Sequence, residues 1–218
     1  MRDVMRNKIK MLNSELMEMA TLVEKQIYNS IKALENHDND LANEVIRDDD
    51  KIDNFQKDIE EKCIKIMATE SPVAKDLRSL YTTSKIVTDL ERMADHAVDI
   101  AKISIKIEGI RLSEEVANTI LEMVEIVTTM IKKAIEAYIN GDVEYAYEIC
   151  NMDDKVDDLY RGLFDIALKK MISDNSLINQ GTQILFVSKY LERIGDHVTN
   201  ICEWIVFLKK GKYVDLNE

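Results

Sequence analysis

The chain has 218 residues, of which 46% are hydrophobic and 32% are charged, with one proline and six glycines. This composition is typical of a water-soluble protein built from long helices, because sheet proteins need more turn residues. The formal net charge of −12 at pH 7 argues against nucleic acid as a partner, since a surface that binds phosphate backbone needs a basic patch.

Two further features bear on location. The longest apolar run near the end, residues 205–208, is far shorter than the roughly 18 residues of a membrane span, and the first twenty residues are interrupted by charge and lack an apolar signal core. The three cysteines, Cys63, Cys150 and Cys202, are widely spaced without a CxxC motif. These features predict a cytoplasmic protein with three reduced thiols and no transmembrane segment.

In the first half, apolar residues at helical spacing predict a helix over residues 4–34 and a second helix over residues 41–69. Ser71 and the only proline, Pro72, follow. A serine before a proline is typical of a helix start, so the third helix is expected to be capped by Ser71, to begin at Pro72 and to end near Gly109.

In the second half, Ser113 is expected to cap a fourth helix that runs to Asn140. Gly141 is a typical helix stop, and the fifth helix is predicted over residues 142–171. After a short loop, the sixth helix ends near Lys210. Each half therefore contains three long helices with short connections, which is the pattern of a three-helix bundle.

The two halves also resemble each other in sequence. The segment TDLERMADHAVDIAK at residues 88–102 recurs as KYLERIGDHVTNICE at residues 189–203. In the same way DDKIDNF at residues 49–55 recurs as DDKVDDL at residues 153–159. Such matched segments indicate a tandem duplication.

The predicted fold is therefore all-α, with six long helices arranged as two tandem, similar three-helix bundles. The first repeat is assigned to residues 1–110 and the second to residues 111–218.

Four of the helices carry two acids four residues apart, at the border of the apolar stripe that faces the core. Neighbouring helices in each half would bring four carboxylates together, where their like charges repel and bound cations would relieve the repulsion. All-oxygen ligands favour hard ions such as ferric iron, manganese, magnesium or calcium, and zinc also binds carboxylates. The candidate metal ligands are Asp49, Asp53, Glu91, Asp95, Asp153, Asp157, Glu192 and Asp196.

The basic residues beside these acids are interpreted differently. His96 and His197 follow the acids but point away from the carboxylate edge, so they are read as capping, supporting or surface side chains rather than metal ligands. Arg92 and Arg193 are read as ion-pair partners of the acids. A single DxxxD pair is commonly a solvated face, whereas four pairs at matched angles favour a metal site.

The chain resembles the PhoU family, the accessory and regulatory proteins of phosphate-specific transport in bacteria and archaea. The resemblance rests on LERMADHAVDIA, LERIGDHVTNICEWIVFL, the segment SPVAKDLR at residues 71–78 and the two DDK(I/V)D segments, and it covers essentially the whole chain. It implies two three-helix bundles, each with a multinuclear iron or zinc cluster on its acidic pairs. The chain departs from the family pattern at Ala94 and Asp99, where its own second repeat has Gly195 and Asn200.

The resemblance also implies a function. Family members are implied to be non-enzymatic, cytoplasmic and often homodimeric regulators of phosphate uptake and phosphate homeostasis. They are implied to regulate the phosphate transporter and phosphate-starvation signalling negatively, by contacting the transporter ATPase subunit and a sensor histidine kinase. Peripheral association with the membrane would then come through these partners.

Two alternatives remain at this point. The first is a carboxylate-bridged metal-binding helical bundle with redox or metal-storage activity, but such bundles use Glu-x-x-His ligand pairs, which neither LERMADH nor LERIGDH supplies. The second is a purely structural bundle whose acids bind no metal. No nucleophile and base arrangement or Gly-rich phosphate loop indicates an enzyme, and direct phosphate binding is not expected of an acidic chain without a basic pocket.

Overall fold

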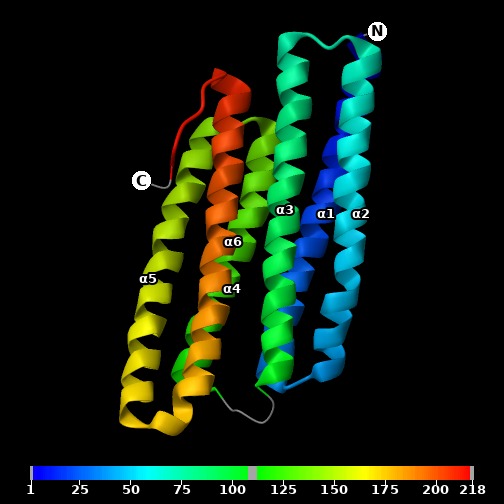
Figure 1. Cartoon of the computed structure of the whole chain (residues 1–218). Coiled ribbons are helices and arrows are strands. Elements are labelled where there is room, and N and C mark those ends of the chain that lie inside the picture. The colour runs from blue at the N-terminus through cyan, green and yellow to red at the C-terminus, as the bar shows by residue number, and fades with distance from the viewer. Residues whose placement is uncertain (1, 108–111, 217–218) are drawn as a thin grey trace.

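The computed structural model describes residues 2–107 and 112–216 of the chain, which form six long α-helices and one short 3₁₀ turn (Figure 1). Within these residues, no helix is both long and apolar enough to cross a membrane. The elements are α1 (Arg2–Asn36), α2 (Asn39–Glu70), α3 (Ala74–Lys106), α4 (Glu114–Asn140), α5 (Val143–Ser173), η1 (Asn175–Leu177) and α6 (Ile178–Lys210).

The helices form two groups of three that lie side by side. Helices α1, α2 and α3 pack together, as do α4, α5 and α6, and the two groups meet where α3 contacts α6 and α1 contacts α4. Figure 1 shows α3 and α6 next to each other in the middle, with α2 and α5 at the outer edges. The all-α prediction is confirmed. The predicted boundary between residues 110 and 111 and the predicted helix end near Gly109 lie outside the described residues.

The apolar stripes of the helices form one continuous core that includes residues of both groups. Leu16, Leu90 and Leu191 are fully buried in it, and each such side chain contributes roughly 1.5–3 kcal/mol on burial. Tyr138 of α4, only 4% exposed, shares a 2.7 Å hydrogen bond with the Thr83 hydroxyl of α3. The two halves therefore share apolar packing and a buried polar contact.

The connection between α2 and α3 differs from the prediction. Ser71 does not cap the start of α3; it ends α2 in the left-handed conformation, with φ 47°, and Val73 precedes α3. The physical reason is the following Pro72, whose ring disfavours the right-handed helical conformation in the residue before it. The predicted start of α3 at Pro72 is therefore wrong, and the helix begins at Ala74.

The start and end of α4 follow the sequence more closely. Gly141 adopts φ 62° and ends α4, and the next residue, Asp142, accepts a 3.1 Å hydrogen bond from the Tyr145 backbone N–H at the start of α5. Ser113 lies at the predicted capping position of α4. Its hydroxyl, however, contacts the Lys170 ammonium of α5 at 2.6 Å, so it ties α5 to the loop before α4.

Candidate metal centres

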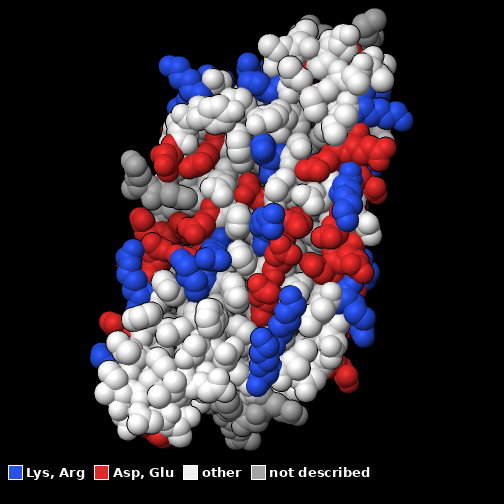
Figure 2. Space-filling model, in the orientation of Figure 1, with Lys and Arg blue, Asp and Glu red and all other residues white. Residues whose placement is uncertain are grey.

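Figure 2 shows acidic side chains gathered at mid-height over α2 and α3 on one side and over α5 and α6 on the other, with basic side chains between them. We call the four paired acids of the first half, Asp49, Asp53, Glu91 and Asp95, the first cluster, and those of the second half, Asp153, Asp157, Glu192 and Asp196, the second cluster.

In the first cluster, α2 and α3 bring carboxylates from both acidic pairs together. Burial, followed by the negative charges of Asp95 and Asp53, raises the pKa of Asp49 to about 6. Burial and the charge of Asp95 also raise the pKa of Glu91. The pKa of Asp49 on α2 is raised by Asp95 of α3, and the pKa of Glu91 on α3 is raised in smaller part by Asp53 and Asp49 of α2, so acids of the two helices lie near one another.

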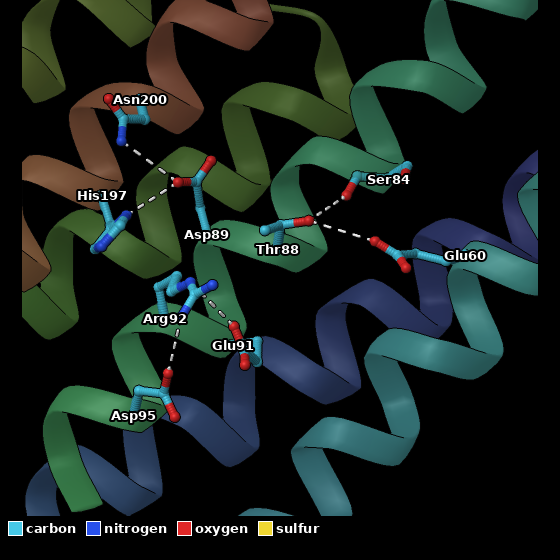
Figure 3. Close-up of polar contacts among 9 residues, drawn as sticks. All are labelled: Glu60, Ser84, Thr88, Asp89, Glu91, Arg92, Asp95, His197 and Asn200. Atoms are coloured by element: carbon cyan, nitrogen blue, oxygen red, sulfur yellow. Dashed lines mark hydrogen bonds and ion pairs between the residues drawn. The ribbon is translucent and has the colours of Figure 1, made fainter. Parts of the chain in front are cut away.

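Basic side chains occupy the outer side of the first cluster. The Arg92 guanidinium lies 3.3 Å from a carboxylate oxygen of Asp95 and 3.6 Å from one of Glu91 (Figure 3). On α2, Lys57 lies 3.6 Å from Asp53. The interpretation of Arg92 as an ion-pair partner is confirmed.

The largest rise in a carboxylate pKa occurs in the second cluster. Burial raises the pKa of Asp153 to about 7, and the charges of Asp196, Asp157 and Glu192 add to the effect. Burial also raises the pKa of Glu192 and of Asp196. An acid whose pKa approaches neutrality is poorly compensated in its ionised form, so this cluster has a stronger need for positive charge.

Cations flank the second cluster as well. Lys189 lies 2.5 Å from a Glu192 carboxylate oxygen, and Arg161 lies 3.0 Å from Asp157. With these pairs in place, the part of the chain that the structure describes contains no group of three or more His, Cys, Asp or Glu side chains that could hold a metal ion as they stand. Metal binding would require the acids to turn from their cationic partners towards one another.

The surroundings of the Asp153 carboxylate indicate whether the second cluster suits a metal ion. Its Oδ1 atom is buried and has no hydrogen-bond partner among the described residues. A Cβ atom at Gly195 would lie 2.2 Å from this oxygen, so the absence of a side chain there makes room for the carboxylate. A buried carboxylate oxygen without a donor is costly. A hard cation beside this oxygen would satisfy it, and the all-carboxylate donors of the cluster suit such an ion in their chemistry.

The first cluster is built differently at the equivalent place. Ala94, fully buried on α3, stands where α6 has Gly195. On α1, the Gln26 side chain, which is only 4% exposed, donates a 3.0 Å hydrogen bond to the Val45 backbone carbonyl of α2 and partly offsets the rise in the pKa of Asp49. Gln26 was not among the candidate residues, although a polar residue between the buried Val23 and Ile27 is a signal for it.

The two histidines lie in the α3–α6 interface. His197 Nδ1 is 3.0 Å from an Asp89 carboxylate oxygen, and Asn200 donates to the same oxygen at 3.4 Å (Figure 3). The His96 ring stacks on Tyr190, with 5.5 Å between ring centroids. Both histidines are thus engaged between the two halves, a role that helical spacing alone did not predict.

The family model for the PhoU domain matches the chain twice, over residues 16–104 and 120–205. The chain belongs to the PhoU family. Its two PhoU domains contain α1 to α3 and α4 to α6, and each carries one acidic cluster. PhoU proteins are regulatory and non-enzymatic.

Individual relatives agree with this assignment. A phosphate-specific transport system accessory protein PhoU homologue of Clostridium acetobutylicum is 47% identical over 218 residues, covering 100% of this chain and 99% of the relative. A homologue in Borreliella burgdorferi is 34% identical, covering 95% and 96%.

Solved structures show the same PhoU fold. The phosphate transport system regulatory protein PhoU from Streptococcus pneumoniae superposes with a TM-score of 0.89 at 28% identity, covering 97% of this chain and 99% of that one. PhoU from Pseudomonas aeruginosa superposes with a TM-score of 0.87 at 32% identity, covering 95% and 99%.

Proposed function

We propose that this chain is an accessory regulator of phosphate transport, acting as a non-enzymatic adaptor whose two acidic clusters bind metal ions. The observation that supports metal binding most directly is the buried, unpartnered Oδ1 atom of Asp153 among three other carboxylates. When bound, the cations would neutralise the repulsion within each cluster and tie α2 to α3 and α5 to α6. Iron and zinc, in multinuclear clusters, are the proposed metals.

The proposed partners are the ATPase subunit of the phosphate transporter and a sensor histidine kinase, both contacted in the cytoplasm. Through them the chain would restrain phosphate uptake and phosphate-starvation signalling, and would associate with the membrane only peripherally. A rigid helical body suits this role, because long helices packed on a shared core present fixed surfaces to partners.

The redox or metal-storage alternative is not favoured. Helical di-metal enzymes and ferritins place histidine ligands beside their carboxylates. Here His197 pairs with Asp89 and His96 stacks on Tyr190, so both rings are committed to the α3–α6 interface.

Metal content tests the proposal. The untagged protein is purified from cells grown with sufficient iron and zinc, and its metal content is measured by elemental mass spectrometry. We expect several equivalents of metal. A variant with Glu91, Asp95, Glu192 and Asp196 changed to alanine is expected to retain almost none, because each cluster loses two of its four carboxylates.

A control variant removes the same negative charge elsewhere. Asp58, Glu61, Glu144 and Glu148 are exposed acids on α2 and α5 outside the two clusters, and changing them to alanine should leave the metal content unchanged. A parent protein without metal would contradict the metal proposal. Equal loss in both variants would show that nonspecific charge, rather than the clusters, holds the metal.

Partner binding is tested separately, with the purified transporter ATPase subunit and with the cytoplasmic part of the kinase. Co-elution with each is expected for the parent protein. Failure with both partners, in protein shown to contain metal, would refute the adaptor role while leaving the metal sites intact.

A further inference from the structure

Three aromatic side chains gather between α3 and the C-terminal part of α6. The Tyr81 ring on α3 lies edge-on to Trp204 and Phe207 of α6, with 6.0 Å and 6.1 Å between ring centroids. Trp204 and Phe207 are also edge-on to each other, at 6.0 Å. Rings in this arrangement attract one another. We call Tyr81, Trp204 and Phe207 the aromatic platform.

The chain turns back after α6 and places a fourth ring on this platform. Gly211 ends α6 with φ 67°, and Figure 1 shows the following segment returning beside the helix. The Tyr213 ring stacks on Phe207, with 4.5 Å between centroids and an interplanar angle of 18°. It also meets the Trp204 ring edge-on at 5.9 Å. The face of Phe207 is therefore occupied by a residue of the same chain.

A second contact follows three residues after Tyr213. The Leu216 backbone N–H donates a 2.9 Å hydrogen bond to the Glu203 carboxylate, and the Leu216 side chain packs against the core. We call residues 211–216 the tail. It thus engages α6 through an aromatic ring, a backbone N–H and an aliphatic side chain three positions after the ring.

The duplication shows that the fold does not require the stacking ring. The first-half equivalent of Phe207 is Lys106, an exposed residue of α3. A position that bears an exposed lysine in one half does not need an aromatic side chain to fill the core. Aromatic surfaces of this kind are enriched where proteins bind one another.

The tail covers the platform only in part. Tyr213 is 68% exposed and Tyr81 is 39% exposed. The tail is also a short irregular segment that follows the last helix, and terminal segments of this kind open at a smaller cost in free energy than packed helices. A segment that makes the same contacts therefore competes with the tail for the platform.

We propose that the aromatic platform is a docking site for a partner protein, and that the tail occupies the site until the partner displaces it. The partner segment carries an aromatic residue followed three positions later by an aliphatic one, as Tyr213 and Leu216 do in the tail. Its ring stacks on Phe207, and a backbone N–H bonds to Glu203. Docking here requires no metal in the acidic clusters, so this proposal and the metal proposal can fail separately.

The test uses Trp204, the only tryptophan of the chain, whose fluorescence reports on the platform. A synthetic peptide of residues 211–216 is titrated into the full-length Tyr213→Ala variant, whose own tail lacks the ring. We expect a saturable change in Trp204 fluorescence. The parent should need about tenfold more peptide, which corresponds to a tail that is bound in about 90% of the molecules.

Peptide variants test the motif. In the peptide, Tyr213→Phe should retain binding because the stacking ring remains, whereas Tyr213→Ala should abolish it and Leu216→Ala should weaken it. Lys212→Ala is the matched control and should bind like the original peptide. Equal binding of the peptide that lacks the aromatic ring would overturn the assigned motif.

Protein variants test the site, each added to Tyr213→Ala. Phe207→Lys places the residue of the equivalent position, Lys106, in α6 and should abolish peptide binding. Tyr81→Ala should weaken binding from the α3 side without altering α6. Tyr28→Ala, an exposed tyrosine of α1, should bind like Tyr213→Ala alone. Circular dichroism and urea unfolding verify that each variant is folded.

Four results would refute the proposal. They are the absence of a saturable signal in Tyr213→Ala, equal peptide affinity in the parent and Tyr213→Ala, and undiminished binding by a folded Phe207→Lys variant. The fourth is a change of oligomeric state in Tyr213→Ala, measured by light scattering, which would mean that the tail bridges two copies of the chain instead of covering its own platform.

Discussion

Gly195 allows the Asp153 carboxylate to approach the backbone of α6, because a Cβ atom at this position would lie 2.2 Å from Oδ1. We predict that Gly195→Ala displaces the Asp153 side chain and lowers the metal content of the second cluster, so that the protein binds about half as much metal in total. Overpacking should also reduce the free energy of unfolding by about 1–3 kcal/mol. Elemental analysis and urea unfolding measure the two effects.

Ala94→Gly is the matched control, since Ala94 is the first-half equivalent of Gly195. It removes a methyl group from α3 and should cost about 1 kcal/mol in helix propensity without loss of metal. Unchanged metal content in Gly195→Ala would mean that Asp153 does not bind the metal from its position against α6.

Asp153 is also expected to make the free energy of unfolding depend on pH. In the metal-free protein, burial and the neighbouring acids raise its pKa from 3.8 to about 7, so the folded state favours the protonated form. The stability that this protonation contributes is complete below the unfolded pKa and is lost as the pH rises through about 7. The chelator-treated protein is therefore expected to have a higher urea midpoint at pH 5 than at pH 8.

Asp153→Asn identifies the source of this difference, because asparagine does not titrate. The variant should show a smaller change of midpoint between pH 5 and pH 8 than the parent, with Asp49, whose pKa is raised to about 6, contributing to what remains. Glu148→Gln, a change at an exposed acid of α5 outside the cluster, should behave like the parent. An identical pH profile in all three proteins would exclude a raised pKa at Asp153.

Among the helices, one acid of α3 links it to α6 through two polar contacts. Asp89 of α3, with a side chain only 13% exposed, accepts from Asn200 and contacts His197 on α6. Asp89→Ala leaves both partners without this oxygen in a partly buried interface. We expect a loss of about 1–3 kcal/mol in the free energy of unfolding, measured by urea denaturation.

Asp99→Ala serves as the comparison, because Asp99 pairs with Lys102 on the exposed side of the same helix. Exposed ion pairs contribute about 0–1 kcal/mol, so this variant should be close to the parent. If the two substitutions cost the same, Asp89 would contribute only as a surface charge and would not hold the halves together.

At the scale of the whole molecule, charge limits where a second copy can bind. Each chain carries −12, and faces with acidic clusters would repel each other. Figure 2 shows a surface with very few charges over the lower parts of α5 and α6. Exposed apolar side chains on these helices include Phe164, Leu168, Ile172, Ile178 and Phe186.

We propose that this surface mediates the homodimer expected for the family, since burying uncharged side chains avoids the desolvation of ions. The double variant Leu168→Glu with Ile172→Glu, the second position being 74% exposed, should be monomeric in light scattering coupled to gel filtration. Ile64→Glu, at the first-half equivalent of Leu168, should remain dimeric. A monomeric parent protein, or dissociation by Ile64→Glu alone, would contradict this assignment.

Local patterns in the chain were sufficient to predict the helices, the duplication and the edges on which the acids lie. Helical periodicity is a local property, so the positions of Glu91 and Asp95 relative to the apolar stripe of their own helix could be read without the fold. Gly141 was also predictable as a helix end, because the left-handed conformation favours glycine.

The contacts between helices, by contrast, became visible only in the packed fold. Gln26 of α1 donates to the Val45 carbonyl of α2, and His197 of α6 contacts Asp89 of α3, only because particular helices are neighbours at a particular height, which no local pattern specifies. Helical periodicity gives each residue an angle around its own helix. The packing of the helices decides which side chain of a neighbouring helix faces that residue.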